Sequence, residues 1–324
     1  MFLQDKATIG VEQEAVPGTP ESLLQANYNL RVANLEYDHT IAEYKRKYLI
    51  GSFSRDASIM GKQSGTFSFY IDIAGGTGAA VANPISVLLN ACGILNAVQG
   101  TTGVLYTPYT PYANKTCTVE IVERDEGVSP TQLVMKFAGC AGNCRYVLNE
   151  IGQPVRAEFE MQGKLVSIAD RAFGSLIVPD LITTVPVKVL SATFTHAAVA
   201  QVLETFTLDF GNEIQAKSSP AEASGIEHFY ISGREPKLTC NPYVRTLAGE
   251  AVYTQWLAGT TGALSFAWGS SGANLHTIAA PVAQYVGVKP VVRNGARAYE
   301  KSFLLVKSAD IGDDEWSYLQ GSLV

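Results

Sequence analysis

Two cysteines four positions apart, Cys140 and Cys144, and four histidines are the residues that could bind a metal ion. A structural zinc site usually needs four nearby ligands in two closely spaced pairs, and the sequence offers no second pair. The histidines match no metal-binding spacing such as His-Glu-x-x-His. They are His39, His196, His228 and His276. We therefore predict no metal site, and we interpret the histidines as turn or surface residues.

Glycines and carboxylates form two further groups that match chemical motifs only in part. Gly75-Gly-Thr-Gly78 lacks the lysine and the spacing of a phosphate-binding loop, and no Gly-x-Ser-x-Gly precedes a helix. The acidic run Asp310–Glu315 lacks the Asp-x-Asp-x-Asp-Gly register of a calcium loop, so we interpret it as a solvated turn. The sequence thus predicts no catalytic residue and no cofactor, and we expect no enzyme.

The composition restricts the class of protein. The chain has 324 residues, a net charge of -6 and only 17% charged residues. It therefore lacks the broad basic surface with which proteins grip nucleic acid phosphates. A content of 10% aromatic residues, with 29 glycines against 14 prolines, is typical of many short strands joined by tight turns. We predict a mainly β fold.

The cysteines and the apolar runs indicate where the chain is made. Five cysteines, an odd number, are scattered over a chain long enough to form a core without disulfides, so we expect them to be reduced. No apolar run reaches the ~18 residues of a membrane span. The N-terminus lacks the charged start and apolar stretch of a signal peptide. These features predict synthesis in a cytoplasm and no membrane span.

Alternating polar and apolar residues predict the strands. The clearest is 64–73, where Thr66, Ser68, Tyr70 and Asp72 share one face and apolar residues share the other. Asn83-Pro84 and the closing Gly93 predict a short helix over 85–93. Residues 38–62 carry several cations and are predicted to form a long projecting loop. Further strands are predicted at 30–37, 117–124, 132–137, 144–149 and 155–166.

The second half of the sequence repeats the order of elements in the first. Residues 204–212 resemble the strand at 30–37, and residues 245–257 supply a second helix. Near the end, residues 295–300 resemble residues 152–158. We therefore predict two similar β-sandwich or barrel domains, each with one short flanking helix. The predicted division is an N-terminal arm (1–29), a first domain (30–168), a linker (169–186) and a second domain (187–324).

Several motifs occur in a characteristic order along the first half. Ile9-Gly-Val-Glu-Gln-Glu14 and Val16-Pro-Gly-Thr-Pro20 open the chain, Gly61-Lys-Gln-Ser-Gly65 precedes a strand, and Asn83-Pro84 begins the helix. In this order they resemble the tail tube, or major tail, proteins of long-tailed bacteriophages. The repeated order of elements resembles the fused two-domain type of that family. The resemblance covers about residues 1–166 and is weaker beyond residue 187.

The resemblance implies a virion structural protein. In such proteins each domain contributes a β-sheet to a ring-shaped barrel, and the stacked rings form a conduit for DNA passage into the host. Two tube domains per chain would give trimeric, pseudo-hexameric rings, and one would give hexameric rings. The implied partners are other copies of the chain and the tail terminator, tape-measure and distal tail proteins, while genomic DNA passes without specific binding. The implied location is the virion tail, after assembly in the bacterial host cytoplasm.

Two sets of residues are candidates for these contacts. The projecting segment supplies the inter-ring contact candidates, which are Tyr44, Lys45, Arg46, Lys47, Tyr48 and Arg55. Period-2 alternation supplies the lumen candidates, which are Thr66, Ser68, Tyr70, Asp72, Thr205, Thr207 and Asp209. A neutral or acidic lumen would repel phosphates and let the duplex slide.

A β-sandwich binding module, or another virion structural or adaptor protein, is the alternative function. Exposed aromatic side chains would be the mark of a binding module, and Trp256, Trp268 and Trp316 could form such a platform. Trp256 lies in the predicted second helix, so we interpret it as a core residue.

Overall fold

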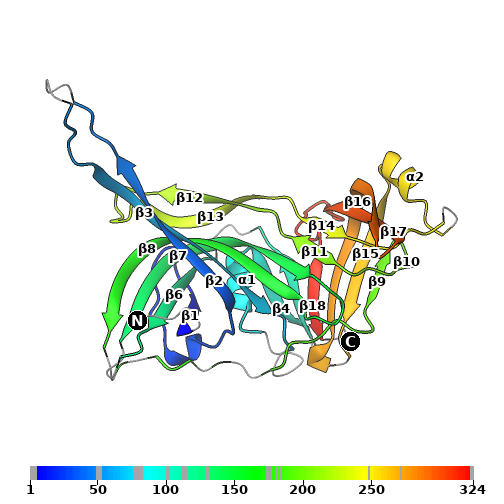
Figure 1. Ribbon diagram of the computed structural model, residues 1–324, viewed down its shortest axis with the longest axis horizontal. Coiled ribbons are helices and arrows are strands. Elements are labelled where there is room, and N and C mark those ends of the chain that lie inside the picture. The colour runs from blue at the N-terminus through cyan, green and yellow to red at the C-terminus, as the bar shows by residue number, and fades with distance from the viewer. Residues whose placement is uncertain are drawn as a thin grey trace.

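The computed structural model describes residues 6–48, 53–75, 83–99, 103–110, 115–127, 131–172, 175, 177–179, 181, 184–246, 249–270 and 272–321. The chain is mainly β, with antiparallel strands and two short α-helices (Figure 1). The predicted mainly β class is therefore confirmed. Within the described residues the strands form no closed barrel.

Six strands of the first half (residues 6–172) pair in the spatial order β1–β6–β7–β8–β3–β2. β1 lies in the segment that was predicted as an arm, and it pairs with β6 because Ile9 and Val11 are buried against the core. The six strands are β1 (Thr8–Gln13), β2 (Ala33–Tyr44), β3 (Ile59–Asp72), β6 (Cys117–Arg124), β7 (Gln132–Leu148) and β8 (Arg156–Arg171).

Six strands of the second half (residues 187–321) pair in the order β9–β15–β16–β17–β14–β11. This order matches the first half strand for strand, with β9 in the place of β1 and β11 in the place of β2. The strands are β9 (Thr193–His196), β11 (Phe206–Asp209), β14 (Lys237–Cys240), β15 (Thr261–Trp268), β16 (His276–Arg293) and β17 (Ala296–Leu305).

The remaining elements surround this framework. The short strand β10 (Val199–Gln201) pairs with β9, and β18 (Ser317–Gly321) pairs with both β16 and β5. β12 (Asn212–Ser218) and β13 (Ile226–Arg234) form a separate hairpin. The other elements are β4 (Ile94–Gln99), β5 (Gly103–Pro108), α1 (Ser86–Ala91), α2 (Val252–Leu257) and two 3-10 turns, η2 (Gln25–Asn27) and η3 (Gly272–Asn274).

A single hydrophobic core runs through both halves. At the junction, the ring of Tyr146 packs edge-on against Phe210 and Trp316, with centroids 5.3 and 6.2 Å away. Phe206 stacks on Phe266 at 4.7 Å. Because aromatic side chains bury large apolar areas, this shared core fixes the two halves to each other.

The structure differs from the predicted element boundaries in two places. β2 and β3 remain paired out to Tyr44 and Ile59, well inside the predicted 38–62 loop. The residues there have no buried face, so their sequence lacks the alternation that predicts a strand. The predicted strands 132–137 and 144–149 are one strand, β7, interrupted by a bulge at Gly139, whose φ is +61°. The glycine turn after Gly75 lies outside the described residues.

Candidate assembly interface

The two halves meet where β11 adds to the end of β7. Arg145–Leu148 pair antiparallel with Phe206–Asp209, so the eight strands β2–β3–β8–β7–β11–β14–β17–β16 belong to one sheet. Tyr146, Leu148, Phe206 and Leu208 are fully buried there. The edge of β7 that β6 leaves unpaired is thereby covered by the second half of the same chain.

Asparagine side chains hold the polar side of this junction. Asn143 donates a hydrogen bond to Asp209 Oδ1 at 2.8 Å and accepts one from the backbone N–H of Asn212 at 3.1 Å. Asn212 donates in turn to the carbonyl oxygen of Cys92, just after α1, at 2.8 Å, and to that of Gly142 at 3.0 Å. The start of the β12–β13 hairpin is thus tied both to β7 and to the end of α1.

The β12–β13 hairpin extends from β11 and β14 back over the first half, above β7 and β8 (Figure 1). Ile226 and Phe229 pack with Ala141 in a small buried cluster. At the tip, Lys164 of β8 forms an ion pair with Glu222 at 2.7 Å, and Lys62 of β3 donates to Ser218 Oγ at 2.6 Å. The N–H of Gln63 donates to the carbonyl of Ser224 at 3.0 Å. The hairpin is therefore anchored by apolar packing along its length and by polar contacts at its tip.

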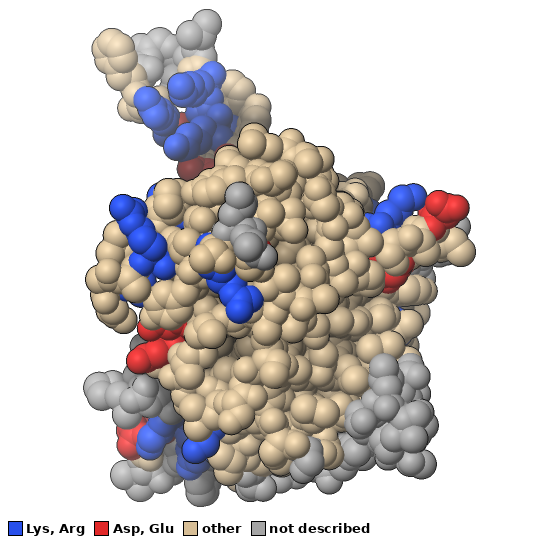
Figure 2. Space-filling view, turned by 90° about the vertical axis from the view of Figure 1, so that its right-hand side faces the viewer, with Lys and Arg blue, Asp and Glu red and all other residues tan. Residues whose placement is uncertain are grey.

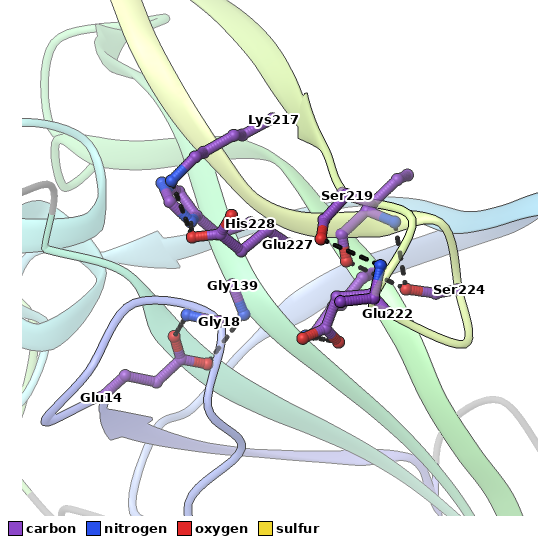
Figure 3. Close-up of polar contacts among 12 residues, drawn as sticks. Glu14, Gly18, Gly139, Lys217, Ser219, Glu222, Ser224, Glu227 and His228 are labelled. Atoms are coloured by element: carbon purple, nitrogen blue, oxygen red, sulfur yellow. Dashed lines mark hydrogen bonds and ion pairs between the residues drawn. The ribbon is translucent and has the colours of Figure 1, made fainter.

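Figure 3 shows a buried carboxylate beside this hairpin. Glu14 accepts hydrogen bonds from the backbone N–H groups of Gly18 and Gly139, both at 2.7 Å, and from Thr118 Oγ1 at 2.9 Å. A Cβ on Gly18, whose φ is +81°, would lie 2.2 Å from the carbonyl oxygen of Glu227 on β13. The hairpin thus lies so close to the N-terminal segment that only glycine fits at this position.

Charged side chains on β12 and β13 lie around the same contact. Lys217 pairs with Glu227 at 2.7 Å, and the ring of His228 is 3.5 Å from the same carboxylate. Burial lowers the pKa of His228. This imidazole was predicted to be a turn or surface residue, but it is buried between β13 and β7, beside Gly139.

Six of the seven lumen candidates share one face of the continuous sheet. Thr66, Ser68, Tyr70 and Asp72 alternate with buried residues along β3, and Thr207 and Asp209 do the same along β11. The pairing register connects the two sets, because Tyr70 lies opposite Glu158, Glu158 opposite Arg145, and Arg145 opposite Asp209. Thr205 precedes β11, and its N–H donates to Asn241 Oδ1 at 2.8 Å. We call the face that carries the six residues the polar face.

The cations of the polar face are paired with carboxylates. Arg145 contacts Glu160 at 2.7 Å and Glu158 at 3.6 Å. Arg156 lies 3.5 Å from Asp72 and stacks over the Tyr70 ring at 4.5 Å. Desolvation raises the pKa of Asp72, against the opposing effect of Arg156. Arg145, Arg156, Glu158 and Glu160 were missed in the sequence, although the alternation of polar residues along 156–162 could have identified this face.

The inter-ring contact candidates lie at the end of the β2–β3 hairpin, which projects from the body of the molecule (Figure 1). We call the described residues of its outer part, 41–48 and 53–60, the arm. Tyr44 and Tyr48 are largely exposed, as are Ile41, Ile59 and Met60. Lysine and arginine side chains gather on the arm in the space-filling view (Figure 2). Arg46 donates to the carbonyl of Ala57 at 2.8 Å, which ties the two sides of the arm together. The arm therefore combines exposed apolar residues with a group of basic residues, Lys45, Arg46, Lys47 and Arg55.

The family model described as phage tail tube protein matches residues 5–302 of the chain. The chain belongs to the phage tail tube family. No curated protein matches it significantly. Because the match includes most of both halves, the second half falls within the same family model as the first. The family makes the chain a structural component of a virion tail that assembles into tube rings.

The described residues of this tail tube protein were also compared with the requirements of a metal site, of a reactive thiol and of a membrane-spanning helix. No group of three or more His, Cys, Asp or Glu side chains there is arranged to hold a metal ion. Cys140 and Cys144 are buried within β7, and burial raises the pKa of both thiols. Neither described α-helix has the length and apolarity that a membrane-spanning helix requires.

The tryptophans form no binding platform. Trp268 and Trp316 are buried, whereas Trp256 on α2 is 36% exposed. The interpretation of Trp256 as a core residue was therefore wrong, because α2 packs less deeply than α1. Sequence reasoning also missed a buried ionic cluster in the second half, in which Lys301 donates to Glu250 at 2.6 Å.

Proposed function

We propose that three copies of this chain form one ring of the phage tail tube, and that stacked rings form the conduit through which DNA passes into the host. The observation that carries the proposal is the continuous sheet, in which β2–β3–β8–β7 and β11–β14–β17–β16 repeat the same strand order side by side. One chain then supplies two tube domains, 30–168 and 187–324, with the N-terminal segment 1–29, whose β1 pairs with β6, before them and a linker (169–186) between them. Three chains supply six such domains.

The polar face is the proposed wall of the channel. Its arginines are neutralised by Glu158, Glu160 and Asp72, so few free cations remain to hold phosphates. A wall of this kind repels the duplex weakly and lets it slide, whereas unpaired cations would hold it in a salt-dependent way. The lumen candidates Thr66, Ser68, Tyr70, Asp72, Thr205, Thr207 and Asp209 are proposed to line this wall.

The arm is the proposed contact between rings. Tyr44, Lys45, Arg46, Lys47, Tyr48 and Arg55 would meet an acidic surface of the next ring, where complementary charge sets register more than affinity. The tail terminator, tape-measure and distal tail proteins are the proposed partners at the ends and in the lumen of the tube. We further propose that the chain is made and assembled in the host cytoplasm and has no enzymatic activity.

Electron microscopy of the purified protein over a range of concentrations tests this function. We expect hollow rings or tubes whose end-on averages have three-fold symmetry. Six-fold averages with one chain per unit would replace the trimer by a hexamer of single tube domains. A protein that stays monomeric at every concentration would contradict the tube and favour a β-sandwich binding module.

A further inference from the structure

The continuous sheet ends in two edges that have no partner strand among the described residues. At one end, β2 pairs only with β3. At the other, β16 pairs with β15 as far as Gln284 and with β17 on its opposite edge, so beyond Gln284 one edge of β16 is open. An open edge presents unpaired N–H and C=O groups and is a template for another strand.

The pairing register shows which residues of the two halves correspond. Tyr37 of β2 lies opposite Phe67, and Phe67 opposite Met161. In the second half Leu208 of β11 lies opposite Leu238, and Leu238 opposite Phe303. Tyr37 therefore corresponds to Leu208. It follows that Asp38 corresponds to Asp209, and Glu36 to Thr207.

The same comparison matches β16 with β7. Arg145 of β7 lies opposite Glu158, with an ion pair of 3.6 Å, and Lys289 of β16 lies opposite Glu300, also with an ion pair of 3.6 Å. Glu158 and Glu300 each lie three residues before the corresponding Met161 and Phe303. Lys289 therefore takes the place of Arg145, and Val291 takes the place of Val147.

We propose that β2 of one copy adds to the open edge of β16 in the next copy, in the way that β11 adds to β7 within the chain. The proposal rests on the ring function above and names the contact that closes the ring. Asp38 of one copy lies opposite Lys289 of the next, and Glu36 lies opposite Val291. Opposite charges on facing strands stabilise a pair, so Asp38 and Lys289 favour this register.

Burial supports the proposal, because positions that are covered in the first half are open in the second. Leu148, at the end of β7, is 0% exposed, whereas Val292, at the corresponding position of β16, is 65% exposed. Ala91, the last residue of α1, is 1% exposed, and Leu257, the last residue of α2, is 85% exposed. Figure 2 views the end of the molecule formed by the second half, and much of that surface is uncharged. This is the composition expected of a surface that a second copy covers.

The arm also contributes a residue to the proposed contact between copies. In the first half, Asn212 at the start of the hairpin covers the end of α1 through its bond to Cys92. The corresponding residue of the arm is Ile41, which is 46% exposed. Across the proposed contact it would meet the end of α2, where Trp256 and Leu257 are exposed. The apolar contact of Ile41 with the end of α2 would thus take the place of the polar contact that Asn212 makes with the end of α1.

Pro290 of β16 makes the proposed β2–β16 pairing differ from the β7–β11 pairing within the chain. It corresponds to Tyr146, and a proline can accept but not donate a ladder hydrogen bond. The proposed pair therefore has one bond fewer than β7 with β11. Proline is confined to edge strands and bulges in sheets, which fits an edge that pairs only on assembly.

Paired cysteines test the register. Glu36→Cys and Val291→Cys in one chain would lie across the new contact, and because every copy carries both, oxidation should link three chains covalently. Thr207→Cys with Val147→Cys is the matched control, since these residues are paired within the chain and should form an internal disulfide. The backbone N–H of Phe210 donates to the carbonyl of Cys144, and in this ladder Thr207 and Val147 are therefore a pair that faces each other without a direct backbone hydrogen bond. Side chains lie closest in pairs of this kind. Thr66→Cys with Val291→Cys, which keeps one cysteine but moves the other away from the edge, should remain unlinked.

The outcomes separate this proposal from the ring function. Hollow rings with a three-chain product from Glu36→Cys/Val291→Cys, under conditions where Thr66→Cys/Val291→Cys gives none, are the expected result. Rings in which only the internal control oxidises would overturn the β2–β16 contact and leave the ring function standing. A protein that forms no rings and no linked product would contradict both.

Discussion

The two halves of the long sheet differ more in what covers them than in how they are built. In the first half, the end of β7 and the end of α1 are sealed by β11 and by the β12–β13 hairpin. In the second half the corresponding parts of β16 and α2 expose Val292 and Leu257. The comparison teaches that this surface is completed within the chain in the first half, whereas in the second half it is exposed and is the surface that we propose a neighbouring copy covers.

The cores of the two halves also differ at one matched position. Phe69 lies opposite Phe159 in the first half, with ring centroids 5.5 Å apart. In the second half Cys240 lies opposite Lys301, whose ammonium is buried and donates to Glu250 at 2.6 Å and to Gln201 at 3.1 Å. Tyr285 also donates to Glu250, at 3.0 Å. An apolar pair in one half is thus replaced by an ionic cluster in the other.

The largest effect is expected from Glu250→Gln, which breaks this cluster. Lys301 would keep a buried charge without its partner, and loss of one member of a buried ion pair costs about 3–5 kcal/mol of unfolding free energy. Urea denaturation followed by tryptophan fluorescence measures it, since all three tryptophans lie in the second half. Glu300→Gln, at an exposed pair, is the control and should cost less than about 1 kcal/mol. A Glu250→Gln protein as stable as the control would show that the ion pair of Glu250 with Lys301 does not contribute to the free energy of unfolding.

The second prediction concerns acid. Burial lowers the pKa of His196 and of His276 to about 4, from an unfolded value near 6.5, so the unfolded chain binds more protons between these pH values. Stability is therefore full above about pH 6.5 and falls towards pH 4, by up to roughly 3 kcal/mol for each histidine. Urea denaturation at a series of pH values measures the slope.

Both histidines lie in the second half, and replacing one of them tests whether they cause the loss of stability in acid. His276→Phe removes one titrating group that stacks between Trp268 and Tyr318, and it should flatten the slope by about half. Phe266→Leu, which changes another ring beside Trp268 but removes no titrating group, should lower stability at every pH and leave the slope as it is. Equal slopes in both variants would contradict the assignment.

Gly18→Ala should loosen the hairpin that covers the first half. The new methyl group would meet Glu227 on β13, and the positive φ adds backbone strain, so a loss of about 1–3 kcal/mol is expected. Gly152→Ala is the matched control, because its φ is also positive, at +94°, but nothing lies within 4 Å of the added carbon. Hydrogen exchange of the β12–β13 amides should quicken in Gly18→Ala alone. Similar exchange in both variants would show that the hairpin does not depend on this contact.

The smallest effect is expected at the hairpin tip. Lys164→Met removes a mostly buried ammonium from Glu222 and should cost about 1 kcal/mol, whereas Lys217→Met removes an exposed partner of Glu227 and should cost less than half of that. Thermal unfolding at low and high salt measures both. Equal losses in the two variants would mean that burial of Lys164 adds nothing to the contact.

Much of this structure could be predicted from residues whose pattern is local. The alternation of Thr66, Ser68, Tyr70 and Asp72 and the Asn83-Pro84 helix start depend only on neighbours in sequence, and both are found. The β7–β11 junction could not be predicted, because Leu148 and Phe206 are brought together by pairing between distant segments. Nor could the buried Lys301, since its partner Glu250 is fifty-one residues away and belongs to no motif.

A three-dimensional reconstruction of assembled tubes, at a resolution that places side chains, is the most direct test of the central claim. We expect three chains per ring, with the sheet running from β2 to β16 and on into the next copy, and with Thr66, Tyr70, Thr207 and Asp209 facing the channel. Tubes whose polar face lies on the outside, or rings in which the two halves are not neighbours around the channel, would contradict it.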